Sequence, residues 1–119
     1  MPAKLTIPLT IALACGVLAV QAFAATSRTV GLSNYHITIS SASAPHGAIT
    51  FRVTNNSPAT THTFSIKRIS TGHVLYNSPL ISAGHSVAPT KTLAAGTYQL
   101  YCRLPGHAAL GMKRNFTVT

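Results

Sequence analysis

The sequence contains no aspartate and no glutamate. An average chain is about a quarter charged, so a chain of 119 residues should carry roughly a dozen acidic side chains. Their complete absence is therefore not a chance result. Without side-chain carboxylates, the chain has no acid–base carboxylate pair, no aspartyl chemistry and no oxygen-rich site for calcium or magnesium.

The charge that remains is entirely positive. Nine lysines and arginines are present, and one of them, Lys4, lies in the N-terminal segment, so the rest of the chain carries +8. These eight are Arg28, Arg52, Lys67, Arg68, Lys91, Arg103, Lys113 and Arg114. Nucleic-acid-binding proteins cluster basic residues on one face or stripe, whereas these are scattered. We therefore expect no nucleic acid partner.

The N-terminal segment has the layout of a secretory signal peptide. A short basic start precedes an apolar run from Leu5 to Val20, and Ala22-Phe23-Ala24 offers a small-residue cleavage site. We predict a signal peptide over 1–24 and one domain over 25–119, exported to the periplasm or the extracellular space. Two alternatives are an uncleaved membrane anchor and a lipoprotein signal at Cys15.

Cysteine is scarce. If Cys15 leaves with the signal peptide, Cys102 is the only cysteine of the exported domain, which excludes an internal disulfide. An odd thiol in an exported protein is paired between chains, reactive, occupied by a ligand, or buried and inert.

After residue 25 the sequence alternates apolar and polar residues in short runs separated by turn residues. This period-two pattern predicts an all-β sandwich or barrel without helices. Ala83-Gly84 and Ala95-Gly96 are expected to form hairpin turns. The apolar members of the alternating runs are Tyr35, Ile37 and Ile39; Ile49, Phe51 and Val53; Phe64 and Ile66; Tyr98 and Leu100; and Phe116 and Val118.

The same parity places two polar residues on inner faces. His62 shares a face with Phe64 and Ile66, and Cys102 shares one with Tyr98 and Leu100. A buried histidine without a partner costs free energy. We therefore expect His62 and Cys102 to meet.

The segment from Cys102 to Met112 spaces its donors as Cys-x4-His-x4-Met, with His107 in the middle. Two histidines and a cysteine in a trigonal array with a weak axial methionine define the blue-copper electron-transfer site. Methionine is a poor zinc ligand, and structural zinc sites normally use four cysteines and histidines. We predict one copper ion bound by His62, Cys102, His107 and Met112. His36, His46, His73 and His85 fit no ligand pattern, and we expect them at the surface.

The stretch from Gly47 to Val118 resembles the cupredoxins. The residues that carry the resemblance are the approach Gly96–Cys102, the loop elements Pro105-Gly106-His107 and Gly111-Met112, and Asn55 with the His62-x-Phe64 pair. The loop spacing is similar to that of rusticyanin and sulfocyanin. The resemblance implies a Greek-key β-sandwich or barrel with a type 1 copper site. Thr63 stands where many members have an asparagine after the first histidine.

These observations predict a monomeric electron carrier rather than an enzyme, with no catalytic residues. The apolar residues around His107 are expected to dock a redox protein such as a cytochrome or terminal oxidase; they are Leu104, Pro105, Ala108, Ala109 and Leu110. One alternative is a copper chaperone or buffer that delivers copper to an exported oxidase. Another is a metal-free adhesion-type sandwich, which requires that Cys102 and His107 lie far from His62. The lack of acids indicates either an acidic habitat or an anionic partner such as a membrane surface.

Overall fold

The computed structural model describes residues 25–119, so the predicted signal peptide over 1–24 and its cleavage site lie outside the described residues. Within residues 25–119 the regular elements are all strands, and no helix there is long and apolar enough to cross a membrane. The strands are β1 (Thr26–Ser33), β2 (His36–Ile39), β3 (Ser43–Ala44), β4 (Gly47–Asn55), β5 (Ser65–Arg68), β6 (Val74–Asn77), β7 (Ser86–Val87), β8 (Thr90–Leu93), β9 (Gly96–Tyr101) and β10 (Lys113–Val118).

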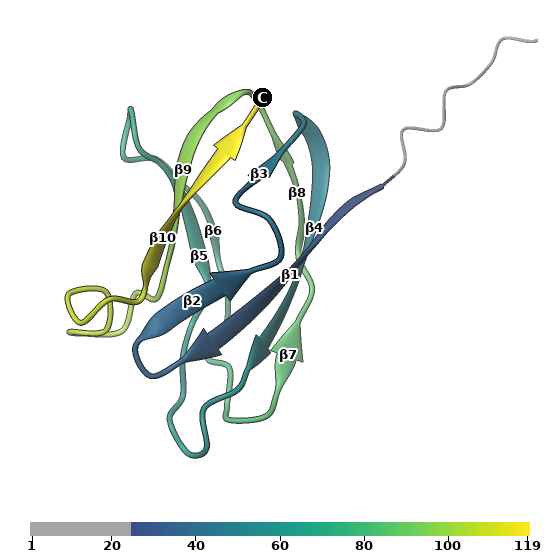
Figure 1. Ribbon diagram of the computed structural model, residues 1–119. Coiled ribbons are helices and arrows are strands. Elements are labelled where there is room, and N and C mark those ends of the chain that lie inside the picture. Colours follow the sequence, from purple (N-terminus) through teal and green to yellow (C-terminus); the bar gives the residue numbers. More distant parts are fainter. Residues whose placement is uncertain (1–24) are drawn as a thin grey trace, which may run out of the picture.

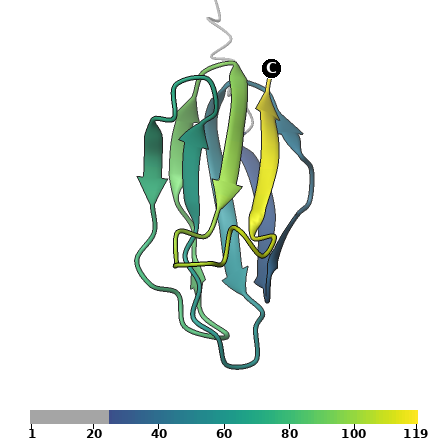
Figure 2. The same ribbon diagram turned by 90° about the vertical axis from the view of Figure 1, so that its left-hand side faces the viewer.

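The strands form two sheets that pack face to face (Figure 1 and Figure 2). One sheet has the order β2-β1-β4-β7, with β8 also paired to β4, and the other has the order β3-β10-β9-β5-β6. The β1–β4 and β3–β10 pairs are parallel, and the remaining pairs are antiparallel. The predicted all-β sandwich is confirmed.

The core follows the alternation read from the sequence. In β4, Ile49, Phe51 and Val53 are fully buried, whereas the intervening residues lie on the outer face. The ring of Phe51 lies 5.6 Å from that of Phe64, which directly precedes β5 of the opposite sheet, and 5.5 Å from that of Phe116 in β10. Tilted and edge-to-face aromatic contacts of this kind pack the two sheets together.

Two local expectations are wrong. The strand predicted to begin at His62 begins at Ser65, and every residue from 62 to 66 is buried instead of every second one. His62 is held instead by an isolated backbone bridge, in which its N–H and C=O pair with Ile81 at 3.1 and 2.8 Å. Tyr35 was expected to share a face with Ile37 and Ile39, yet it lies in the β1–β2 turn and is 38% exposed.

The Ala83-Gly84 and Ala95-Gly96 turns also differ from the expectation, because neither closes a hairpin. Gly96 begins β9 in one sheet directly after β8 of the other sheet. Gly84 precedes β7, which pairs with β4 rather than with the preceding strand. Each turn therefore connects two strands that are not paired with each other. A turn motif in the sequence does not show whether the strands on either side of it are paired, so it cannot distinguish this connection from a hairpin.

The arginines find neutral partners in place of carboxylates. The guanidinium of Arg28 donates to the carbonyl of Ser43 at 2.8 and 2.9 Å. Arg68 donates to the carbonyl of Ala95, and Arg103 to that of Ser78, both at 2.7 Å. Carbonyl groups do not titrate, so these contacts are not lost when the pH falls, as ion pairs with carboxylates are.

Candidate metal centre

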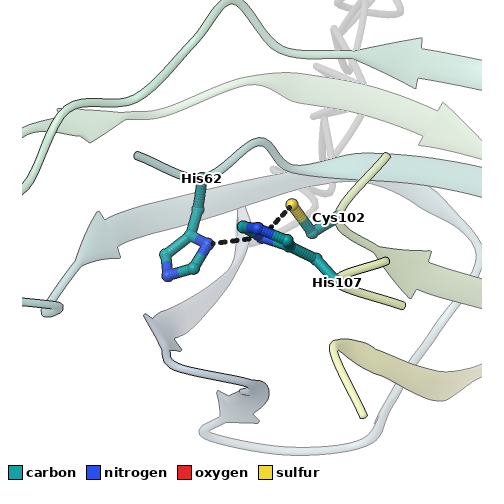
Figure 3. Close-up of side chains that lie close together, drawn as sticks. All are labelled: His62, Cys102 and His107. Carbon is teal, nitrogen blue, oxygen red and sulfur yellow. Dashed lines mark hydrogen bonds between the residues drawn. The ribbon is translucent and has the colours of Figure 1, made fainter. Parts of the chain in front are cut away.

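Three predicted ligands converge at one end of the sandwich (Figure 3). His62 lies in the segment before β5, Cys102 follows the last residue of β9, and His107 lies in the loop that leads to β10. The two Nδ1 atoms of His62 and His107 are 3.2 Å apart, and Sγ of Cys102 is 3.6 Å from Nδ1 of His107. His62 and Cys102 are fully buried, whereas His107 is partly exposed.

The loop from Cys102 to Met112 is folded back on itself by its own backbone. The N–H of Cys102 donates to the carbonyl of Met112, and the N–H of Met112 donates to the carbonyl of His107, both at 3.1 Å. Gly106 has a φ of +80°, a left-handed conformation that lets the chain turn immediately before His107. These bonds bring His107 and Met112 back to Cys102, and the Met112 side chain is fully buried there.

Thr63 links the first histidine to the ligand loop. Its backbone N–H donates to Sγ of Cys102 at 3.4 Å, and its hydroxyl lies 3.5 Å from the same sulfur. The hydroxyl oxygen also accepts a hydrogen bond from the N–H of Arg103 at 3.0 Å. Thr63 thus ties the two segments together at the position where many cupredoxins have an asparagine.

The environment of His62 orients its ring. Its Nε2 lies 2.8 Å from Oγ of Ser57 and 2.9 Å from Oδ1 of Asn34, while its Nδ1 faces His107. Burial, and secondly the nearby His107, lower the pKa of His62 from its ordinary value, so the neutral ring is favoured. A neutral imidazole is the form that binds a metal.

Asn55 holds the segment that carries His62. Its amide nitrogen donates to the carbonyls of Thr60 and Ile81 at 2.8 Å each, and its oxygen accepts from the N–H of Ser57 at 3.0 Å. Asn55 is fully buried, and all of these partners surround the loop before His62. The asparagine that the resemblance placed in this segment is therefore a structural anchor of the site.

Sequence patterns did not indicate two further residues of the site, Asn34 and Tyr35. Both lie in the β1–β2 turn, beside the ligand loop (Figure 1). The ring of Tyr35 packs edge-on against that of His107, with 5.2 Å between the centroids. The alternation predicted a strand residue at Tyr35 and no role for Asn34, and no local signal relates either residue to histidines far along the chain.

The remaining histidines do not join this group. His36, His46, His73 and His85 are exposed, as expected. Across residues 25–119, His62, Cys102 and His107 form the one group of three or more side chains suited to a metal ion. Because these three lie together, the requirement for the metal-free adhesion reading is not met.

The donor set fits a copper ion. Nitrogen and sulfur ligands lie about 2.0 to 2.3 Å from a first-row metal ion. If the angle between two such ligands at the ion is about 110°, the two ligand atoms are roughly 3.3 to 3.5 Å apart. The Nδ1–Nδ1 distance of 3.2 Å and the Sγ–Nδ1 distance of 3.6 Å are close to this range. Two imidazole nitrogens, a thiolate and a thioether are the soft to intermediate donors that copper takes. No carboxylate is available anywhere in the sequence to favour a harder ion.

Comparison with known proteins agrees with this chemistry. The sequence model of the family of copper-binding proteins, plastocyanin/azurin type, matches residues 17–119. No curated protein sequence matches the chain significantly.

Solved structures resemble the described fold. Dithionite-reduced auracyanin from Roseiflexus castenholzii has 24% identity and a TM-score of 0.67, and the match covers 81% of this chain and 98% of that one. Rusticyanin from Thiobacillus ferrooxidans has 17% identity and a TM-score of 0.65, with 78% and 76% covered. A purple cupredoxin from Nitrosopumilus maritimus has 24% identity and a TM-score of 0.54, with 79% and 99% covered. At these identities the likenesses concern the fold, and the cupredoxin-like fold expected from the sequence is confirmed.

Proposed function

The chain belongs to the plastocyanin/azurin family of copper-binding proteins, and on that premise we propose that it is an exported single-electron carrier. Its copper ligands are His62, Cys102 and His107, with Met112 as a weak fourth ligand. Copper in such a site supplies reversible one-electron exchange between Cu(I) and Cu(II).

The observation that carries the proposal is the convergence of two imidazole Nδ1 atoms and one thiol sulfur in a largely buried site at one end of the sandwich. Each donor is fixed by its own backbone. His62 is bridged to Ile81, and Cys102 is bonded to Met112 at the closed end of the loop. Ligands that cannot move adapt little to a change of charge, which favours electron transfer over substrate chemistry. We therefore propose a carrier rather than an enzyme.

Some residues of the site hold the ligands in place, and others exclude water from them. The backbone N–H of Thr63 donates to the sulfur of Cys102, and its hydroxyl lies 3.5 Å from the same atom, so Thr63 holds the sulfur in place. The fully buried side chains of Met112 and Phe64 keep solvent from the inner side. Only His107 reaches the surface in part, so its ring is the route by which an electron enters or leaves.

The surface around His107 supports docking of a redox protein there. Leu110 is 63% exposed, Pro105 and Ala109 are exposed, and Leu104 and Ala108 are partly exposed beside the histidine. No acidic side chain interrupts this apolar surface. Transient electron-transfer complexes use small interfaces, so a patch of this size is sufficient. We propose that a cytochrome or a terminal oxidase docks there with a monomer of this chain.

Export follows from the predicted signal peptide over 1–24 and places the domain 25–119 in the periplasm or the extracellular space. If the signal is not cleaved, the same domain remains attached to the membrane. An anionic membrane surface would attract a chain of this charge in either case.

The test is to add copper to the purified protein and record its absorption spectrum through repeated cycles of chemical oxidation and reduction. An intense blue, green or purple Cu(II) form that returns unchanged after each cycle supports the proposal. The alternative copper chaperone should remain colourless with Cu(I) and transfer its metal to an acceptor protein within minutes. Burial of Cys102 and His62 supports holding the metal over releasing it.

A further inference from the structure

The β1–β2 turn contributes to the copper site from the sheet that does not carry the ligand loop. Its residue Asn34 lies 28 positions before His62, yet its side-chain oxygen is 2.9 Å from Nε2 of that ring. The hydroxyl of Ser57 donates to the same oxygen at 3.1 Å and also lies 2.8 Å from Nε2. The amide nitrogen of Asn34 donates to Oγ1 of Thr60 at 3.1 Å, so both ends of the amide have a partner.

These contacts determine which nitrogen of His62 carries the proton. An amide oxygen can only accept hydrogen bonds, whereas a serine hydroxyl can both donate and accept. Because the single proton of the Ser57 hydroxyl is donated to Asn34, this hydroxyl can only accept from Nε2. The oxygens of Asn34 and Ser57 are therefore both compatible only with a proton on Nε2. Nδ1 then keeps its lone pair, and Nδ1 is the atom that faces His107.

The turn is held against the site by a second contact. The Tyr35 ring packs on His107, and a Cβ added to Gly111 would lie only 2.8 Å from the carbonyl oxygen of Tyr35. Gly111 has a φ of +123° and belongs to the ligand loop. Only glycine fits both this conformation and this close approach. The turn and the loop are thus packed backbone to backbone, which keeps Asn34 within reach of His62.

We propose that Asn34 is a positioning residue of the copper site, whose side-chain oxygen accepts the Nε2 proton of His62 and so presents Nδ1 to the metal. The inference rests on the proposed function, because it assigns a role toward the copper ion. Outer hydrogen-bond partners of ligating histidines typically change metal affinity by about 10- to 100-fold when they are removed.

The experiment compares the copper-bound protein with its Asn34→Ala, Asn34→Asp and Asn115→Ala variants. Asn115 is an exposed asparagine of β10 and serves as the matched control. Long-range proton–nitrogen NMR of the Cu(I) protein identifies the protonated nitrogen of His62 and the exchange rate of its proton with water. A competing chelator measures the rate at which copper is lost, and circular dichroism checks that each variant is folded.

The proposal predicts a slowly exchanging Nε2 proton in the wild-type protein. Asn34→Ala should lose copper about 10- to 100-fold faster and exchange this proton faster. Asn34→Asp keeps an acceptor oxygen and should restore slow exchange and slow copper loss, while Asn115→Ala should match the wild type. A purely structural role for Asn34 would not give this rescue.

Three outcomes would overturn the inference. One is copper bound through Nε2 of His62, and another is a folded Asn34→Ala variant that retains copper and its proton like the wild type. The third is an Asn34→Asp variant no better than Asn34→Ala. In each of these cases a reversible coloured copper protein would leave the proposed function intact, whereas failure of the wild type to bind copper would refute both.

Discussion

The absence of acidic side chains leads to a quantitative prediction about stability in acid. A carboxylate that is salt-bridged in the native state has a lowered pKa, and its contribution is lost as the pH falls through that pKa. One such aspartate contributes about 2.6 kcal/mol at neutral pH. For a domain of this size, 1 kcal/mol corresponds to about 4 to 8 °C in melting temperature. This chain has no such side chain. Its copper ligands still respond to acid, because a histidine binds the metal only in its neutral form and the folded pKa of His62 is lowered. The melting temperature should therefore fall with pH through these ligands alone, without any contribution from a side-chain carboxylate.

The matched perturbation restores one carboxylate. Nε of Arg52 donates to Oγ of Ser27 at 3.2 Å on the exposed face of the β1–β4 pair. Ser27→Asp would place a carboxylate beside the guanidinium of Arg52. The positive charge would lower the pKa of this carboxylate below its value in the unfolded chain. An exposed pair of this kind is worth about 0.2 to 1 kcal/mol. Because the folded pKa is the lower one, this stability is present above the unfolded pKa and is lost as the pH falls.

The assay is thermal unfolding of the copper-bound protein at fixed ionic strength from pH 5 to pH 2.5, with copper occupancy followed by absorption. Ser27→Asp should lose about 1 to 8 °C more than the wild type over this range, whereas the neutral Ser27→Asn control should follow the wild type. A wild-type melting temperature that falls as steeply as that of Ser27→Asp, with copper still bound, would refute the reasoning.

Three further predictions concern the site and its support. Met112→Leu should keep copper and raise the reduction potential measured by voltammetry, because a thioether donor stabilises Cu(II) more than Cu(I); loss of copper would instead make Met112 a principal ligand. Leu110→Glu should slow electron exchange with the physiological partner in stopped-flow mixing, with an unchanged spectrum, whereas Ile69→Glu, at an exposed apolar residue just past β5, should not; equal rates would place docking elsewhere. Tyr98→Phe removes a 2.7 Å hydrogen bond to the carbonyl of Ala94 and should cost about 0.5 to 1.5 kcal/mol in urea unfolding, and an unchanged midpoint would contradict this.

Strand interiors and their inner faces could be predicted from the sequence because both sheets bury one face. Period-two alternation therefore records burial directly in β4, β9 and β10. The spacing of Cys102, His107 and Met112 indicated a metal loop for the same local reason, since all three lie on one short segment.

The predicted alternation of buried and exposed residues was wrong where a polar side chain is buried by partners from another segment. Thr63 and Ser65 are buried although they alternate with apolar residues. Thr63 is covered by Cys102 and Arg103, and the hydroxyl of Ser65 donates to Asn77 at 2.7 Å. A polar residue whose partner lies 12 positions away, as for Ser65, or 40 positions away, as for Thr63, has the same appearance in the sequence as one that faces water.

Asn34 and Tyr35 were not predicted for a related reason. Their contacts with His62 and His107 depend on how the β1–β2 turn of one sheet meets the ligand loop of the other. That arrangement depends on the packing of the two sheets and on Gly111, which allows the close approach of the turn. The sequence of the turn alone carries no information about either.

The most direct test of the copper assignment is the absorption spectrum of the Cu(II)-loaded Cys102→Ser variant beside that of the wild type. The thiolate of Cys102 is the source of the intense colour in the proposed site. We predict a strongly coloured wild-type protein and a Cys102→Ser variant that is folded and nearly colourless. A variant that keeps the intense absorption, or a colourless wild type that contains bound Cu(II), would contradict the account.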